Sequence, residues 1–181
     1  MAFRLWKKAI LMTLREKKIF TVFILIYTSL IFLTSLFMQL AFTGGLGGVA
    51  GFFILIFFGV SLLLSLLYAW IIVSRNRRTW ATLKCIGYTN ANINSLVTGK
   101  IFFTTFLGFL IVIEVLFHYT AGVGYLQSAN LMTGIPLVLI DLIPVIFTFI
   151  PFLAVQVVAL LLANRKIYKV RPIIALKKVG E

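Results

Sequence analysis

Few residues in this chain of 181 could perform acid–base or metal chemistry, because it has only four acidic residues, one histidine and one cysteine. Cys85 has no second cysteine with which to form an internal disulfide or a cysteine-based metal site. The sequence also lacks the nucleotide-binding P-loop and the HExxH and GxSxG motifs of hydrolases. We therefore expect no catalytic residue, no metal site and no nucleotide site in this chain.

Glu114, His118 and Asp141 stand out because they lie within long apolar runs, where an ionisable residue is by default a functional hypothesis. At about 1.5 Å per residue, Glu114 lies roughly 20 Å into the third run and Asp141 roughly 9 Å from the outer end of the fourth, at similar depth. Two interpretations stay open: a polar patch that lines an outward cavity or shares a proton, and a hydrogen-bonded structural pair. The prolines of the fourth run are expected to kink or unwind it around Asp141; they are Pro136, Pro144 and Pro151.

The elements that hold these residues are predicted to be membrane helices. The chain is 62% hydrophobic and 12% charged, with a mean hydropathy of +1.12, far from the balance of a soluble protein. Four apolar runs reach the roughly 20 residues that cross a bilayer core, and none alternates in polarity as a transmembrane β-strand does. They are Ile19–Phe42, Val49–Ser74, Ile101–Ala121 and Ile135–Ala163. The sequence predicts an all-α integral membrane protein with four transmembrane helices.

All 17 Lys and Arg residues lie outside these runs. Six precede the first run, five lie between the second and third, and six follow the fourth, whereas the other two connections carry none. By the positive-inside rule, both termini and the segment 75–100 are in the cytoplasm and the protein is a multi-pass protein of the cytoplasmic (plasma) membrane. The net charge of +13 then indicates contact with anionic lipid headgroups and not with nucleic acid.

The segments outside the spans complete a single membrane domain, residues 1–181. Residues 1–18 are predicted to form an amphipathic helix, since Phe3, Trp6, Ile10 and Leu14 recur at helical spacing. This helix is either a basic anchor or an elbow that braces the first span. The remaining boundaries are spans at 19–42, 49–74, 101–121 and 135–163, a cytoplasmic coupling segment at 75–100, and a basic tail at 164–181.

The segment 75–100 is a patterned basic island between two apolar runs. We expect helix from Arg75 to Ile86, a C-cap at Gly87 and an N-cap at Thr89. A second helix is predicted from Asn90 with an apolar face that feeds into the third span at Lys100; this face consists of Ile93, Leu96 and Val97. Two short helices around a glycine break would form a compact knob that fits a cleft on a soluble partner.

Residues Arg77 to Thr89, RRTWATLKCIGYT, resemble the cytoplasmic segment of FtsX/MacB-type ABC transporter permeases. The C-terminal run Arg171 to Lys178, RPIIALKK, is similar to the closing element of that family, and the order of parts agrees over nearly the whole chain. Two departures stand out. Thr79 occupies a position where relatives usually have an acid, and only Thr43 to Gly48 connects spans one and two, where most relatives insert a large extracytoplasmic domain.

The resemblance implies a permease subunit that couples ATP hydrolysis by a separate ATPase to export or extraction of a hydrophobic substrate (lipid, peptide or drug), or to mechanotransmission. ATP and Mg would be bound by that ATPase and no cofactor by this chain. The second permease of the dimer would be either another copy of this chain or a different permease. It also stays open whether a separate extracytoplasmic protein supplies the missing domain. The expected ATPase-coupling residues are Trp80, Leu83, Lys84, Ile86 and Gly87. The alternative for Trp80 is that it is only an aromatic residue of the membrane interface.

A small-residue seam along the second span would allow close helix approach, either between two permeases or within one subunit. It consists of Gly47, Gly51, Ser61, Ser65 and Ala69. Two other functions stay open: a proton-coupled four-span exporter that uses Glu114, and a membrane scaffold or regulator without transport. The basic island and tail argue against the exporter, which has no need of them.

Overall fold

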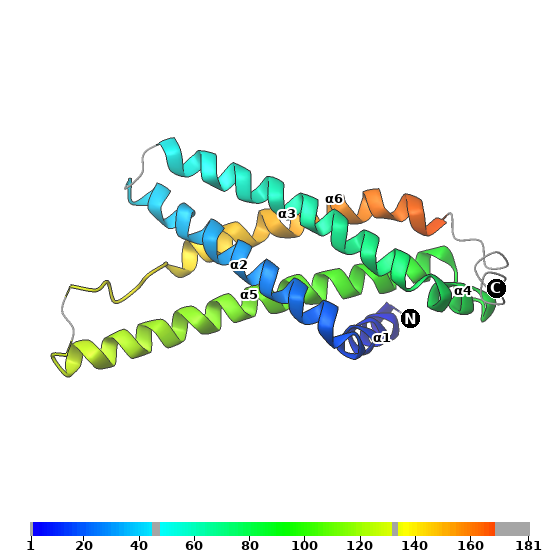
Figure 1. Cartoon of the computed structure of the whole chain (residues 1–181), viewed down its shortest axis with the longest axis horizontal. Helices are drawn as coiled ribbons and strands as arrows, with labels where there is room; N and C mark the ends of the chain where they lie inside the picture. Colours follow the sequence, from blue (N-terminus) through cyan, green and yellow to red (C-terminus); the bar gives the residue numbers. More distant parts are fainter. Residues whose placement is uncertain (1, 45–47, 132–133, 169–181) are drawn as a thin grey trace. The chain divides into compact units, whose positions relative to one another are not determined.

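The computed structural model describes residues 2–44, 48–131 and 134–168, and this part of the chain is helical without any strand (Figure 1). The predicted basic tail beyond Tyr168, with its RPIIALKK run, lies outside the described residues. The helices are α1 (Ala2–Arg15), α2 (Lys17–Phe42), α3 (Gly48–Arg75), α4 (Arg77–Cys85), α5 (Asn90–Ser128) and α6 (Leu142–Tyr168). The all-α prediction is confirmed.

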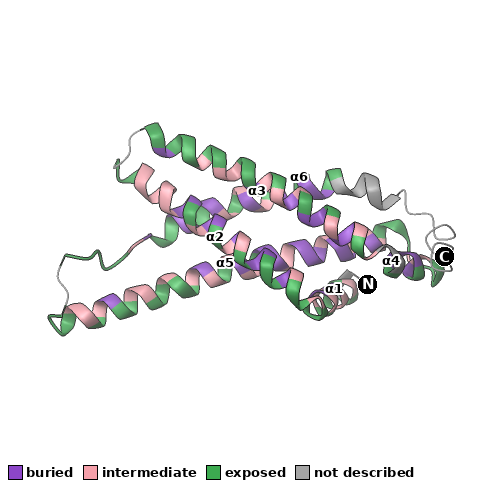
Figure 2. Ribbon diagram, in the orientation of Figure 1, coloured by how far each residue is buried: buried purple, intermediate pink, exposed green. Residues whose placement is uncertain are grey.

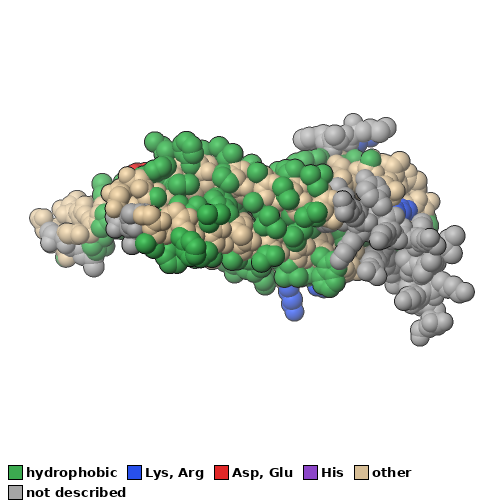
Figure 3. All heavy atoms as spheres, turned by 90° about the horizontal axis from the view of Figure 1, so that it is seen from above, with side chains coloured by type: hydrophobic (Ala, Val, Ile, Leu, Met, Phe, Trp, Pro, Cys, Tyr) green, Lys and Arg blue, Asp and Glu red, His purple; other side chains and the backbone are tan. Residues whose placement is uncertain are grey.

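Four of the described helices, α2, α3, α5 and α6, are long and apolar enough to cross a membrane. Hydrophobic side chains make up much of the face seen in Figure 3. The longest is α5, whose 39 residues extend over about 58 Å, almost twice a bilayer core of about 30 Å. The second half of the coupling segment and the third span are therefore one uninterrupted helix.

The chain divides into two compact units, and every long helix contributes to both. Of the described residues, unit 1 contains 2–23, 62–104 and 154–168, so it holds the ends of the helices that carry the Lys and Arg residues. Unit 2 contains the described parts of 24–61 and 105–153.

The helix predicted from Arg75 to Ile86 is in fact interrupted at Asn76, where α3 ends and α4 begins. Asn76 has φ −97° and ψ 22°, and its side-chain Nδ2 donates a hydrogen bond of 2.8 Å to Glu16 Oε1. Asparagine has a low helix propensity, and its backbone here departs from helical angles while its amide still donates to Ile72 O. The chain therefore turns at Asn76.

The fourth span starts later than predicted, because α6 begins at Leu142 and residues 134–141 are not helical. Pro136 lacks an amide hydrogen and disfavours helix in the residue before it, whereas Pro144 lies in the first turn of α6, where a missing N–H costs little. The predicted unwinding around Asp141 is confirmed, while Pro151 lies inside the helix.

The N-terminal helix α1 ends at Arg15, and α2 starts at Lys17 after a bend at Glu16. Its inward face is made by Ala9 and Thr13, which are buried, while Trp6 and Leu14 of the predicted apolar stripe remain partly exposed. A helix with one face against its own protein and an exposed apolar stripe is suited to lie in a membrane interface.

Candidate functional site

The glycine break in the coupling segment closes α4 as a Schellman motif. The amide of Tyr88 donates to Leu83 O at 3.0 Å and that of Gly87 to Lys84 O at 3.1 Å. Gly87 has φ +97°, a left-handed conformation that residues with a Cβ rarely adopt. The predicted C-cap is confirmed.

The start of α5 agrees with the predicted second helix. Thr89 Oγ1 accepts a hydrogen bond of 3.3 Å from the amide of Asn92, which is the N-cap geometry. The predicted apolar face is completely buried; it consists of Ile93, Leu96 and Val97. This face packs into unit 1 and leaves the connection itself, residues 85–90, as an exposed α4–α5 tip.

The five predicted coupling residues do not share one surface. Trp80 and Leu83 are 1% and 7% exposed and belong to the core of the chain, so they cannot fill a cleft on a partner as expected. Ile86 is 69% exposed, Gly87 is exposed, and Lys84 is half-buried and takes part in an interaction within the chain. Figure 2 shows this contrast between the buried part of α4 and the exposed turn that follows it.

An ion pair with a buried cation lies in unit 1, the unit that also contains the tip. Lys100 Nζ lies 2.7 Å from Glu16 Oε1, and the Lys100 side chain is only 1% exposed. Asn76 donates to the same carboxylate oxygen, and Lys100 Nζ lies 5.8 Å from the centre of the Trp80 ring, within cation–π range. A buried ammonium requires such partners, because desolvation disfavours an unpaired charge. We call Glu16, Asn76, Trp80 and Lys100 the ion cluster.

The ion cluster joins four places in unit 1: the α1–α2 bend, the α3–α4 turn, α4 and the first turns of α5. No role for Glu16 was predicted from the sequence. The one available signal was that Glu16 is the only acid among the basic residues of the N-terminal segment. Separation of Glu16 from Lys100 would leave the buried ammonium without its counter-charge, so the pair favours movement of the α1–α2 bend together with the first turns of α5.

Contacts along α1 extend this body. Lys8 Nζ donates to the Tyr88 hydroxyl at 3.1 Å and lies 4.8 Å from the centre of its ring. A Cβ on Gly99 would come within 2.9 Å of Ala9 Cβ, so the two helices touch where α5 has no side chain. The N-terminal helix is thus packed against the coupling segment, in keeping with an elbow.

In unit 2, Glu114 and His118 pair with each other on α5. His118 Nδ1 lies 2.9 Å from the backbone oxygen of Glu114 and 3.4 Å from its Oε1. Their side chains are 71% and 73% exposed, so they point away from the rest of the chain. Neither side chain lines the cavity between α2 and α5 that is described below.

Asp141 pairs with Gln39 of α2. Gln39 Nε2 donates to Asp141 Oδ2 at 2.8 Å, and the Asp141 amide donates to Gln39 Oε1 at 3.3 Å. Gln39 lies six residues beyond Leu33, which faces the same cavity as Val115. The prediction that Glu114 and Asp141 lie at similar depth in the membrane stays a prediction.

The irregular segment before α6 obtains its hydrogen bonds from α5. Gln127 Nε2 donates to Ile135 O at 2.7 Å, and the Tyr119 hydroxyl donates to Pro136 O at 3.1 Å. Backbone carbonyls outside a helix need such partners in or near a bilayer. The long outer part of α5 thus stabilises residues 135–141.

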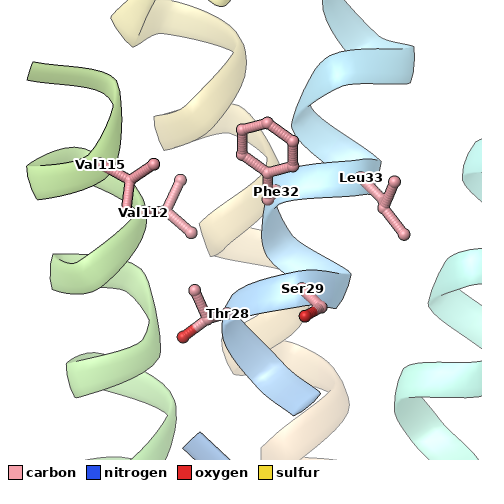
Figure 4. Close-up of a pocket in the computed structure, with 6 residues that line it drawn as sticks. All are labelled: Thr28, Ser29, Phe32, Leu33, Val112 and Val115. Atoms are coloured by element: carbon pink, nitrogen blue, oxygen red, sulfur yellow. The ribbon is translucent and has the colours of Figure 1, made fainter. Parts of the chain in front are cut away.

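A cavity of about 340 Å³ lies between α2 and α5 within unit 2 (Figure 4). Val112 and Val115 point from α5 toward α2, and the hydroxyl of Thr28 provides one of the polar groups. The full lining is Thr28, Ser29, Phe32, Leu33, Val112 and Val115. Its mostly apolar wall with two hydroxyls is suited to a hydrophobic ligand.

The predicted small-residue seam on α3 has two different parts. Ser61, Ser65 and Ala69 are fully buried within the chain. Gly51 is exposed, and a Cβ added there would meet nothing within 4 Å, while Gly47 lies outside the described residues. The buried part therefore packs within one subunit, which is one of the two interpretations given for the seam.

In the part of the chain that the structure describes, no three His, Cys, Asp or Glu residues gather to hold a metal ion. The model of the FtsX-like permease C-terminal family matches residues 51–172, well over half of the chain. No curated protein and no solved structure matches the chain significantly. With four helices able to cross a membrane and this family match, the chain belongs to the FtsX-like family of ABC transporter permeases and is a multi-pass membrane protein.

Proposed function

We propose that a separate ABC ATPase, which binds ATP and Mg, docks on the α4–α5 tip of this permease. The observation that carries the proposal is Ile86, a large apolar side chain that is 69% exposed beside the glycine turn. An apolar anchor of this kind, which enters a pocket on a partner, is typical of the residues that dominate binding energy. The polar groups around it, Thr89 and Asn90 among them, are exposed and suit an interface rim.

The ion cluster supports transmission of force from the tip. A push on Ile86 acts on α4, which the cluster ties to the α1–α2 bend and to the first turns of α5. Because α5 continues without a break from Asn90 to Ser128, a tilt at its start reaches its far end. Trp80 and Leu83 then contribute to coupling as packing residues and not as contacts to the ATPase.

The tip and both termini would lie in the cytoplasm, the compartment in which the ATPase binds ATP. This orientation is supported by the distribution of Lys and Arg, which avoid the two connections at the opposite end. The substrate would be a hydrophobic molecule such as a lipid, a peptide or a drug, since the cavity between α2 and α5 is largely apolar. Glu114 faces away from that cavity, so no observation favours a proton-coupled exporter.

The proposal is tested by Ile86→Asp, with the permease and its ATPase co-expressed and purified in mild detergent. We expect the affinity for the ATPase to fall about thirtyfold or more, the loss typical of a binding hot spot. Ile86→Leu keeps an apolar anchor of the same volume and is the matched control. Leu83→Asp is less informative, because it would bury a carboxylate in the core.

If Ile86→Asp retains full ATPase association while the protein inserts normally, docking is not at the tip. Insertion is verified by protease protection of the connections on the two sides. ATPase activity in the complex provides a second readout, and it should decline in parallel with association.

A further inference from the structure

The side of α1 that points away from the protein carries a basic stripe. Residues spaced three, four and four apart lie on one side of a helix, and all members of this stripe are exposed; they are Arg4, Lys7, Leu11 and Arg15. At about 100° per residue, the stripe lies opposite Ala9 and Thr13, which are buried. Between the stripe and this buried side lies an apolar flank, which consists of Trp6, Ile10 and Leu14. The outward surface of α1 is therefore part basic and part apolar.

Helix α1 lies at the level where the apolar part of α5 begins. The rings of Trp6 and Phe102 have centroids 6.4 Å apart, and a Cβ on Gly99 would come within 2.9 Å of Ala9 Cβ. The apolar run of α5 starts at Ile101. A helix at this boundary, with a basic stripe beside an apolar flank that contains a tryptophan, has the features of a helix that lies in the interface of a bilayer.

The described part of unit 1 holds no counter-charge for the stripe. Its single acidic residue is Glu16, whose Oε1 already accepts hydrogen bonds from Lys100 and Asn76. A basic side chain close to an anionic membrane surface strengthens binding to that surface by about fivefold. The partner that complements the stripe at this depth is the phosphate of an anionic phospholipid.

We propose that the basic stripe binds anionic phospholipid headgroups of the adjacent leaflet, and that this contact holds the α4–α5 tip in the shape that docks the ATPase. Two contacts connect α1 to the tip and to the start of α5. Lys8 Nζ donates to the Tyr88 hydroxyl at 3.1 Å, and Ala9 meets α5 at Gly99. Anionic lipid should therefore raise the affinity of the permease for the ATPase. This effect on affinity rests on the proposed function, whereas headgroup binding does not.

Lipid retention tests headgroup binding without the ATPase. The permease is reconstituted in vesicles of phosphatidylcholine and phosphatidylglycerol and extracted in mild detergent, and the lipids that stay bound are measured by mass spectrometry. We expect phosphatidylglycerol to be enriched on the unmodified protein, and the enrichment to fall at least about fivefold when the stripe is neutralised. The stripe variant combines Arg4→Gln, Lys7→Gln and Arg15→Gln.

The matched control removes three exposed basic residues of unit 1 that lie outside the stripe, and it should keep the enrichment. It combines Lys17→Gln, Lys18→Gln and Arg75→Gln. Unchanged enrichment in the stripe variant would overturn the inference. Equal loss in both triple variants would overturn it too, because the lipid would then respond to total charge and not to the stripe.

ATPase affinity tests whether lipid binding reaches the tip. It is measured in nanodiscs of phosphatidylcholine alone and of phosphatidylcholine with phosphatidylglycerol. We expect the unmodified permease to bind its ATPase at least about fivefold more tightly in the anionic nanodiscs, the lower end of the usual coupling between two sites. The stripe variant should lose this difference and the control should keep it. Equal affinity of the unmodified permease in both membranes would overturn the effect on docking.

Lys8→Met separates lipid binding from its transmission to the tip. It leaves the stripe intact and removes the hydrogen bond to Tyr88, so the variant should retain phosphatidylglycerol while its ATPase affinity no longer depends on the lipid. A lipid dependence that survives in Lys8→Met would overturn transmission through this contact.

The outcomes also keep the inference separate from docking at the tip. Full ATPase affinity in Ile86→Asp would remove the docking proposal and leave the lipid-retention result standing. Loss of affinity in Ile86→Asp, without any lipid enrichment by the stripe, would support docking and overturn the role of α1.

Discussion

In unit 1 the carboxylate of Glu16 is bound by Lys100 and Asn76 inside the protein, whereas in unit 2 Glu114 and His118 pair on an exposed face of α5. Unit 1 therefore pairs these charges inside the protein, although Trp80 Nε1, Asn94 Oδ1 and both polar atoms of the Gln156 side chain are buried there without a hydrogen-bond partner. Unit 2 leaves ionisable groups on an apolar surface that other protein can cover. The two units therefore differ in where their paired ionisable groups lie: in unit 1 they are enclosed by the chain, and in unit 2 they remain on its surface.

Lys100→Met should have the largest effect on stability and tests whether unit 1 depends on its buried charges. Loss of the ammonium leaves the Glu16 carboxylate, which is 27% exposed, with Asn76 as its remaining partner, and loss of a hydrogen bond to a charged group typically costs about 1.5–3 kcal/mol. The measurement is unfolding of the purified protein in detergent micelles with increasing SDS.

Lys17→Met, at an exposed position, is the control and should be near neutral. The double change Glu16→Leu with Lys100→Met removes both charges and should recover much of the lost stability. Equal stability of Lys100→Met and Lys17→Met would show that unit 1 does not rely on the ion cluster.

Gly99→Ala should destabilise unit 1 by about 1–3 kcal/mol, the usual cost of overpacking. The new Cβ would lie 2.9 Å from Ala9 Cβ, so α1 must shift away from α5. The same unfolding measurement applies, and ATPase association should fall if α1 braces the tip. Gly59→Ala is the control, since a Cβ there meets nothing within 4 Å and should stabilise α3 by up to about 1 kcal/mol. Similar results for both variants would argue against tight packing of α1.

Gly87→Ala should cost about 1–2 kcal/mol, because Gly87 has φ +97° and the left-handed region penalises a Cβ by that amount. The Schellman bonds would loosen and the tip would lose its shape, so ATPase association should decline more than global stability does. Gly87→Asn is the informative comparison, since asparagine tolerates this conformation better. A tip that binds equally well with Ala and Asn does not require the glycine conformation.

The cap residues Gly87 and Thr89 could be predicted from sequence because helix caps depend on a few neighbouring residues. The pair Glu16–Lys100 could not, since it joins residues 84 apart and no local pattern links them. The burial of Trp80 was missed for a related reason: α4 is short, and which of its faces turns inward depends on α1 and α5. In α6 the prolines indicated an irregular segment, but hydropathy alone placed the start of the span too early.

Gln39→Leu should have the smallest effect, a loss of about 0.5–1.5 kcal/mol, the usual contribution of a hydrogen bond. Gln39 bonds both the Asp141 carboxylate and its amide, but the pair is exposed, so solvent or headgroups can replace these bonds. Asp141→Asn keeps an acceptor for Gln39 Nε2 and should change stability less. A loss as large as that of Lys100→Met would remove the contrast between the units, because the polar groups of unit 2 would then support its fold as strongly as the ion cluster supports unit 1.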